Sequence, residues 1–142
     1  MTQLRTRLRT LSALVAALAL AAGLAGTALA VKPAAGYTSV LSVNGSCTFT
    51  LVAGWPGGAK VSTVIGQWYL DDAFLATTQA PGSGPNGGTI KGRTATFVAG
   101  PFTDTASAHT WRVITQFYSA AGEQLFGMDS NTITSGCGLA TP

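Results

Sequence analysis

Apolar and polar residues alternate along several short stretches of this chain, each bounded by glycine, proline or other turn-forming residues. In the stretch 46–53, one face carries Cys47, Phe49, Leu51 and Ala53, whereas the intervening positions are mostly threonine. A period of two predicts β-strands, because successive side chains of a strand point to opposite faces. After residue 31 no stretch keeps a helical period, so we expect a protein built from strands.

Seven stretches show this pattern or are rich in residues that favour strands. They cover residues 37–43, 46–53, 61–70, 74–78, 89–99, 110–119 and 124–137, and the last is interrupted near Asp129. Many short strands separated by turns are typical of antiparallel sandwiches and barrels. The pattern therefore predicts an all-β antiparallel sandwich of about seven strands. Its Gly- and Pro-rich stretch 79–88 is expected to be a mobile loop.

The first 30 residues have the three parts of a secretory signal peptide. Three arginines precede an uncharged apolar run over residues 11–25, and an Ala-Leu-Ala cleavage site ends at Ala30. We therefore expect a signal peptide at residues 1–30, followed by one secreted domain over residues 31–142. The alternative is that the uncharged run is retained as a membrane anchor, since its length is close to what a bilayer requires.

The basic character of the chain lies mainly in this leader. The whole sequence has eight Lys+Arg and five Asp+Glu, a net charge of +3. Three of the basic residues are the leader arginines, so the mature chain carries five of each sign and is neutral. A neutral domain lacks the positive surface that nucleic acids and anionic membranes bind. We expect neither as a partner once the leader is removed.

The only two cysteines, Cys47 and Cys137, lie near opposite ends of the expected domain. In an exported protein such a pair predicts one disulfide bond. If successive strands run up and down in turn, the start of the Cys47 strand and the end of the last strand meet at one end of the sandwich. Closing so long a loop stabilises the fold by about 4–5 kcal/mol on the chain-entropy model.

The order of these features resembles a bacterial secreted immunoglobulin-like domain. Cys47 lies in the second expected strand, Trp68 lies in the third, and residues 111–118 form an aromatic, alternating penultimate strand that leads to a glycine turn. The resemblance implies an immunoglobulin-like β-sandwich that binds partners through loops at one end. One departure is that Cys137 lies in the last strand, so the usual disulfide in the middle of the core is not implied.

Few residues could carry catalysis or hold a metal. His109 is the only histidine, Asp104 precedes it by five positions, and no G-x-S-x-G motif occurs. We interpret His109 as a surface residue at a strand edge and expect no enzyme. The pair Asp71-Asp72 and the cluster Asp129-Ser130-Asn131 suit turns, and two oxidised cysteines cannot ligate zinc. We therefore predict no metal and no cofactor.

The three tryptophans differ in their surroundings. Trp68 and Trp111 lie within alternating strands and are predicted to be core residues. Trp55 lies in a loop with Gly54 and Pro56 as neighbours. It either folds back to cap the core or is exposed as a ligand-binding anchor. The expected strand directions place this loop, the 79–88 loop and the 120–123 turn together, at the end away from the disulfide.

These observations predict a secreted, non-catalytic binding or adhesion module. Its end loops would recognise a protein or a cell-surface partner, because loops on a rigid sandwich commonly carry recognition. One alternative is a carbohydrate-binding module in which exposed Trp55 stacks on a sugar. Another is a structural envelope protein without a specific ligand.

Overall fold

The computed structural model describes residues 35–140, so the predicted signal peptide lies outside the described residues. Within this range the chain forms strands, and no described helix is long and apolar enough to cross a membrane. The strands are β1 (Thr38–Val43), β2 (Phe49–Gly54), β3 (Thr63–Leu70), β4 (Ala73–Ala80), β5 (Thr89–Lys91), β6 (Thr94–Ala99), β7 (Thr103–Tyr118), β8 (Gln124–Asp129) and β9 (Ile133–Gly138).

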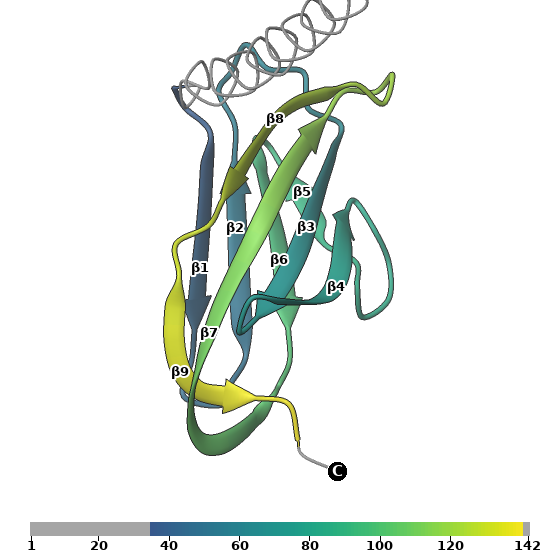
Figure 1. The fold of residues 1–142 in the computed structure, drawn as a ribbon. Coiled ribbons are helices and arrows are strands. Elements are labelled where there is room, and N and C mark those ends of the chain that lie inside the picture. The colour runs from purple at the N-terminus through teal and green to yellow at the C-terminus, as the bar shows by residue number, and fades with distance from the viewer. Residues whose placement is uncertain (1–34, 141–142) are drawn as a thin grey trace, which may run out of the picture. The chain divides into compact units, whose positions relative to one another are not determined.

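The strands form two sheets that face each other as a β-sandwich (Figure 1). One sheet has the order β1-β2-β6-β5, and the other has the order β4-β3-β7-β8, with β9 beside the first half of β7. All ladders between neighbouring strands are antiparallel. The predicted all-β antiparallel sandwich is therefore confirmed.

Two of the seven predicted strands are each divided in two, which gives nine strands among residues 35–140. The stretch 89–99 turns back at Gly92 and Arg93, so that Lys91 pairs with Thr94 and a β5–β6 hairpin forms. Gly92 has a φ of 61°, which glycine adopts without a steric penalty and which tight hairpin turns require. The stretch 124–137 is interrupted after Asp129, as predicted, and forms β8 and β9.

β7 extends further towards the N-terminus than the sequence predicts. A loop is expected over residues 100–108, but β7 already begins at Thr103. Asp104 pairs with Cys137 and His109 pairs with Ser135, so the four residues between them bulge out of the ladder. Pairing with β9 therefore extends the strand through a polar stretch that shows no alternation.

Ser130 and Asn131 shape the break between β8 and β9. The Ser130 amide donates to the Val113 carbonyl at 2.8 Å, and the Val113 amide donates to Ser130 Oγ at 2.9 Å. The Asn131 side chain accepts from the Leu41 amide at 2.7 Å and donates to the Leu41 carbonyl at 2.9 Å. Asn131 thus bonds β1 as a neighbouring strand would, and it closes one long edge of the sandwich.

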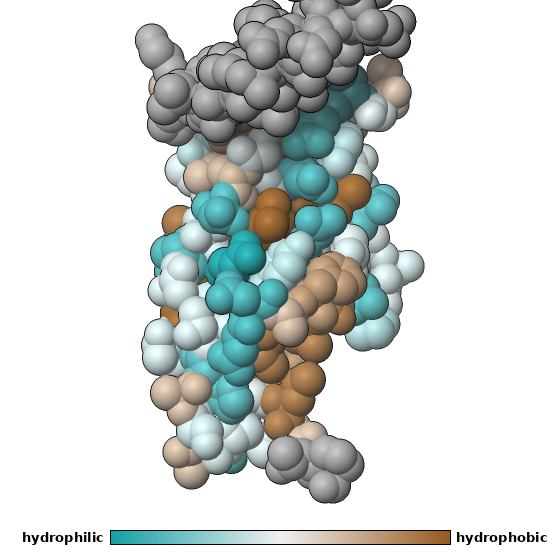
Figure 2. Space-filling view, viewed as in Figure 1, coloured by the Kyte–Doolittle hydropathy of each residue, from teal (hydrophilic) through white to brown (hydrophobic). Residues whose placement is uncertain are grey.

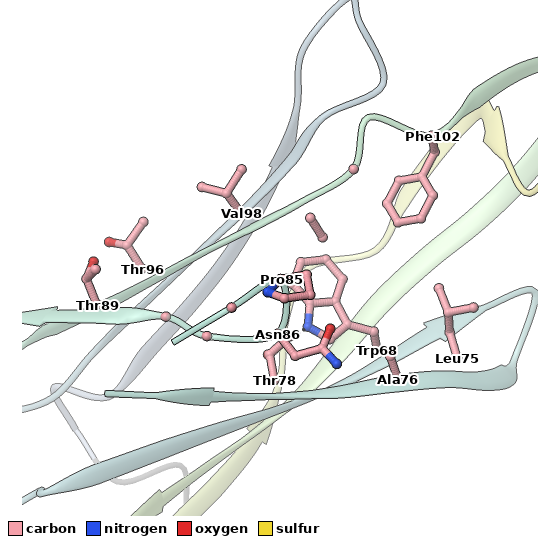
Figure 3. A pocket seen from close by; sticks show the side chains of 15 residues that line it. Trp68, Leu75, Ala76, Thr78, Pro85, Asn86, Thr89, Thr96, Val98 and Phe102 are labelled. Atoms are coloured by element: carbon pink, nitrogen blue, oxygen red, sulfur yellow. Dashed lines mark hydrogen bonds between the residues drawn. The ribbon is translucent and has the colours of Figure 1, made fainter. Parts of the chain in front are cut away.

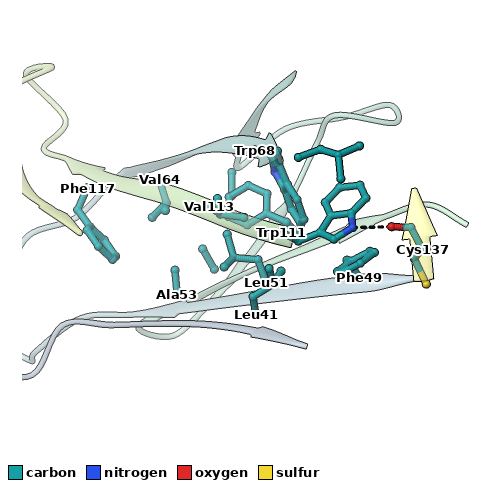
Figure 4. Close-up of a cluster of buried hydrophobic side chains, with 14 of the residues drawn as sticks. Leu41, Phe49, Leu51, Ala53, Val64, Trp68, Trp111, Val113, Phe117 and Cys137 are labelled. Atoms are coloured by element: carbon teal, nitrogen blue, oxygen red, sulfur yellow. Dashed lines mark hydrogen bonds between the residues drawn. The ribbon is translucent and has the colours of Figure 1, made fainter. Parts of the chain in front are cut away.

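The core lies between the two sheets and is rich in aromatic rings (Figure 4). Trp68 and Trp111 are 2% and 0% exposed, which confirms them as core residues. Trp111 packs on Phe49 with ring centroids 4.3 Å apart, and its Nε1 donates to the Cys137 carbonyl at 2.7 Å. The largest fully buried side chains are Trp68, Trp111, Phe49, Phe97, Phe117, Leu51, Val64, Val113 and Thr115.

The predicted disulfide bond is present between Cys47 and Cys137. Cys47 lies in the β1–β2 turn, Cys137 lies near the end of β9, and their Cα atoms are 5.4 Å apart. The bond joins the two sheets at the end where β2 begins and β9 ends, as the alternating strand directions predict. It is therefore an end staple rather than a bond across the middle of the core.

Candidate functional site

A cavity of about 530 Å³ lies between β4 and β6 (Figure 3). It occupies the long edge of the sandwich opposite the edge that Asn131 closes. Its lining comes from Trp68 of β3, part of β4, residues 84–89, the second half of β6 and the segment that follows it. This volume lies within the range of small-ligand sites, roughly 300–1,000 Å³.

Strand direction brings the 81–88 loop to this edge. β4 and β5 both run away from the disulfide end, so the chain must turn back between them. The prediction that this loop lies beside Trp55, at the end opposite the disulfide, is therefore wrong. That prediction treats residues 89–99 as one strand that runs towards the disulfide end. In the structure the stretch is a hairpin, so its first strand, β5, runs in the opposite direction.

Hydrogen bonds and close packing hold the loop in this place. The Gln79 amide donates to the Asn86 carbonyl at 3.0 Å, and the Gly88 amide donates to the Gln79 carbonyl at 2.9 Å. A Cβ atom on Gly88 would lie 2.5 Å from the Phe97 ring and 2.9 Å from the Thr96 carbonyl oxygen. Only glycine fits there, so Gly88 allows the loop to pack closely on β6.

The cavity lining carries no ionisable side chain. Of its polar groups, Trp68 Nε1 donates to Thr78 Oγ1 at 2.9 Å, and Thr78 Oγ1 donates to the Gly66 carbonyl at 3.3 Å. Because these inner polar groups are satisfied by each other, the inner wall presents mainly carbon atoms. Asn86, Thr89 and Thr96 remain as hydrogen-bonding groups in the lining. Such a cavity suits an uncharged, largely apolar group.

Trp55 lies outside this cavity and inside the core. It is 6% exposed, its ring packs edge-on against Phe117 with centroids 6.2 Å apart, and its amide donates to the Arg93 carbonyl at 3.2 Å. The first alternative from the sequence, a residue that folds back to cap the core, describes this position. The second alternative needs an exposed indole ring, which the structure does not present.

His109 forms part of a hydrogen-bonded chain that joins three elements. Its Nδ1 lies 2.7 Å from Asp71 Oδ2 in the β3–β4 turn, and its Nε2 lies 2.8 Å from Thr105 Oγ1 in the β7 bulge. The partner acid is thus Asp71 and not the sequence neighbour Asp104. The hydrogen bond from His109, followed by that from the Thr110 amide, lowers the pKa of Asp71.

This carboxylate–imidazole–hydroxyl order resembles that of a catalytic triad, but the exposed and buried ends are exchanged. In a triad the acid is buried and the hydroxyl faces the substrate. Here the Asp71 side chain is 51% exposed, whereas the Thr105 hydroxyl is part-buried and donates to the Gly136 carbonyl at 3.0 Å. The arrangement ties the β7 bulge to β9 and to the β3–β4 turn, and it exposes no nucleophile.

A second surface of interest lies on the outer face of the sheet that contains β3 and β7. Phe74 is 58% exposed and packs edge-on against Tyr69, with ring centroids 5.8 Å apart. The Arg112 guanidinium lies over the Tyr69 ring at 4.4 Å, and it is paired with Asp72 and Asp129 at 3.3 Å each. Figure 2 shows hydrophobic side chains gathered over β3 and β4 beside a hydrophilic band.

No family model matches the chain, and comparisons with curated proteins and with solved structures give no match either. The cavity is the feature that sequence reasoning missed. Gly92 is the sequence signal that could have revealed it, because a glycine inside a strand-like stretch marks a turn or a bulge, and the turn at Gly92 brings the 81–88 loop to this edge.

Proposed function

We propose that this chain is a secreted, non-catalytic binding module with an immunoglobulin-like sandwich, and that the cavity between β4 and β6 is its ligand site. Strand order supports this architecture. Immunoglobulin constant-type domains have strands A, B, E and D in one sheet and strands C, F and G in the other. Here β1, β2, β6 and β5 occupy the positions of strands A, B, E and D. In the other sheet, β3, β7 and the β8–β9 segment occupy the positions of strands C, F and G.

Secretion is supported by two features of different kinds. The first is the leader-like composition of residues 1–30. The second is the Cys47–Cys137 disulfide, which is compatible with an extracellular location because structural disulfides persist in oxidising compartments.

One observation carries the proposed activity, namely the uncharged and largely apolar lining of the cavity. General acid–base and nucleophilic catalysis rely on titratable or activated groups. Binding of an uncharged apolar group needs only a fitting wall and a few hydrogen-bonding groups. The lining therefore supports recognition rather than chemistry, and it favours a neutral ligand over a charged one.

A fragment screen followed by NMR tests this proposal. Uncharged aliphatic and aromatic fragments should shift the backbone amide signals of residues 84, 86–89 and 98–100, whereas charged fragments of the same shape should not. Ala99→Leu fills the cavity from β6 and should abolish these shifts. Val52→Leu, on an exposed position of β2, is the matched control and should leave them unchanged.

Two results would contradict the proposal. One is that no fragment shifts the cavity amides, and this result would favour the alternative of a structural envelope protein. The other is that charged fragments bind as well as neutral ones, or that Ala99→Leu binds like the wild type.

A second candidate function, glycan binding, is favoured by the exposed Phe74 ring and its neighbours. Aromatic rings beside charged side chains suit the apolar face and the hydroxyl groups of a sugar. The aromatic residue of this hypothesis is then Phe74 and not the buried Trp55. Phe74→Ala should weaken binding on a glycan array by about tenfold or more, equal to roughly 1.4 kcal/mol. Leu125→Ala, at another exposed apolar side chain, is the control.

A further inference from the structure

The backbone of β6 presents an unpaired edge beside the cavity. In an antiparallel ladder, the N–H and C=O groups of alternate residues point to opposite neighbours. The Trp55 amide donates to the Arg93 carbonyl at 3.2 Å, and continuing this alternation makes Ala95, Phe97 and Ala99 the residues of β6 that bond β2. The N–H and C=O groups of Val98 therefore point away from β2, towards the cavity.

No strand among residues 35–140 covers Val98 on that side. β5 pairs with β6 only as far as Thr96, and among residues 35–140 no hydrogen bond reaches the Val98 backbone from outside its own sheet. The edge of β4 differs, because the loop covers it at Gln79 with two backbone hydrogen bonds. β6 thus has free backbone groups next to the cavity at Val98, whereas the β4 edge is covered at Gln79.

Val98 itself carries none of the usual protection against strand pairing, although Pro101 follows the end of β6 and Pro85 lines the same cavity. Exposed edges are commonly guarded by charged side chains, proline or a bulge. Lys91 lies on β5 and not beside Val98, the described pairing of β6 shows no bulge, and Val98 is an exposed apolar residue. An unguarded edge next to an uncharged cavity fits a neutral, extended backbone.

We propose that β6 beside Val98 is a docking edge for an extended, uncharged peptide segment of a partner protein. The segment adds to the sheet as a strand, and its residue opposite Val98 exchanges backbone hydrogen bonds with it. Side chains alternate along a strand, so the next residue, opposite Ala99, points into the cavity, where an apolar side chain fits. This inference rests on the proposed function, because it uses the same cavity.

The test uses synthetic capped peptides of alternating threonine and valine with leucine at the central position. The leucine peptide should bind and should slow amide hydrogen exchange at Val98 by about tenfold or more, as for an amide that enters a ladder. A peptide with aspartate in place of the leucine should not bind. A leucine peptide N-methylated at the residues on both sides of the leucine should also fail, because those N–H groups face β6.

Val98→Pro removes the docking donor from the protein side. Proline is tolerated at a strand edge whose N–H faces away from the sheet, so the β2–β6 ladder keeps its bonds. This variant should bind the leucine peptide about tenfold more weakly than Val98→Thr, which keeps the N–H. If Val98→Pro does not fold, the N-methylated peptide still decides the question on the wild-type protein.

The outcomes separate this inference from the proposed function. If fragments fill the cavity but no peptide slows exchange at Val98, strand addition is wrong and the neutral binding site stands. If neither fragments nor peptides bind, both fail. If exchange at Val98 slows with rising protein concentration and no peptide, the edge pairs with a second copy of this chain, which overturns the assignment to a partner.

Discussion

Single residues in this domain owe their roles to partners distant in the sequence. Trp55 follows a strand and precedes a proline, a setting typical of a surface loop, yet its ring packs on Phe117 of β7. His109 is bonded to Asp71 across 38 positions of the chain. In both cases the neighbours in sequence suggest exposure, and the partner in space decides the role.

Removal of the Trp55 ring should destabilise the domain. Trp55→Ala leaves a cavity at the capped end of the core and is expected to lower the free energy of unfolding by about 3–5 kcal/mol. Urea unfolding measures this loss. Trp55→Phe keeps an aromatic ring in the core, so it should lose less stability than Trp55→Ala. Unchanged stability of Trp55→Ala would show that the ring does not pack in the core.

The hydrogen bond from His109 to Asp71 predicts a pH dependence of stability. The pKa of Asp71 is lower in the folded chain than the usual value of 3.8, so the ionised carboxylate stabilises the fold above that value. The contribution disappears as the pH falls through the folded pKa. Asp71→Asn should therefore be less stable than wild type at neutral pH, and the difference should vanish in strong acid.

Urea unfolding at several pH values measures this difference. Asp72→Asn removes a neighbouring charge that does not contact His109, and it controls for the general effect of charge in this turn. A gap between Asp71→Asn and wild type that stays constant from neutral pH into strong acid would contradict the assignment.

Among the elements, the two long edges of the sandwich contrast most. At one edge Asn131 bonds both backbone groups of Leu41 and links β1 to the β8–β9 segment. At the other edge the loop bonds β4 only at Gln79 and leaves β6 free beside Val98. At the first edge a side chain forms the hydrogen bonds that a neighbouring strand would form. At the second edge the backbone groups of Val98 are free to pair with an added strand.

Asn131→Ala should open the closed edge. Loss of two hydrogen bonds is expected to lower the free energy of unfolding by about 1–3 kcal/mol. Hydrogen exchange at the Leu41 amide should become faster, while exchange in β3 should change little beyond the global loss of stability. Thr132→Ala, at an exposed neighbour, is the matched control, and equal effects of both variants would refute the role of Asn131.

For the whole molecule, the disulfide couples the start of β2 to the end of β9 and so joins the two sheets. The sequence separation between the two cysteines is 90, and closure of a loop of that size stabilises by about 4–5 kcal/mol on the chain-entropy model. The variant Cys47→Ala/Cys137→Ala should be less stable by about this amount in urea unfolding. Denatured, unreduced wild-type protein should contain no titratable thiol, and two thiols would disprove the bond.

Much of the fold could be predicted from local pattern. The alternation in residues 46–53 places Phe49 and Leu51 on the buried face, as observed, and the interruption near Asp129 marks the end of β8. The β5–β6 hairpin was missed because Thr89 to Ala99 keeps a strand-like composition on both sides of Gly92. One missed reversal was enough to move the 81–88 loop from the end of the sandwich to its edge.

The sequence by itself determined most of the strands, the two-layer architecture and the cysteine pairing, because alternation, turn residues and strand count are local properties that leave few arrangements open. Only the tertiary structure decided which edge is closed, where the glycine loop lies and that Trp55 is buried. These features depend on register and on the direction of each strand relative to strands far away in sequence. The candidate binding site is such a feature, since its walls meet only after both sheets have formed.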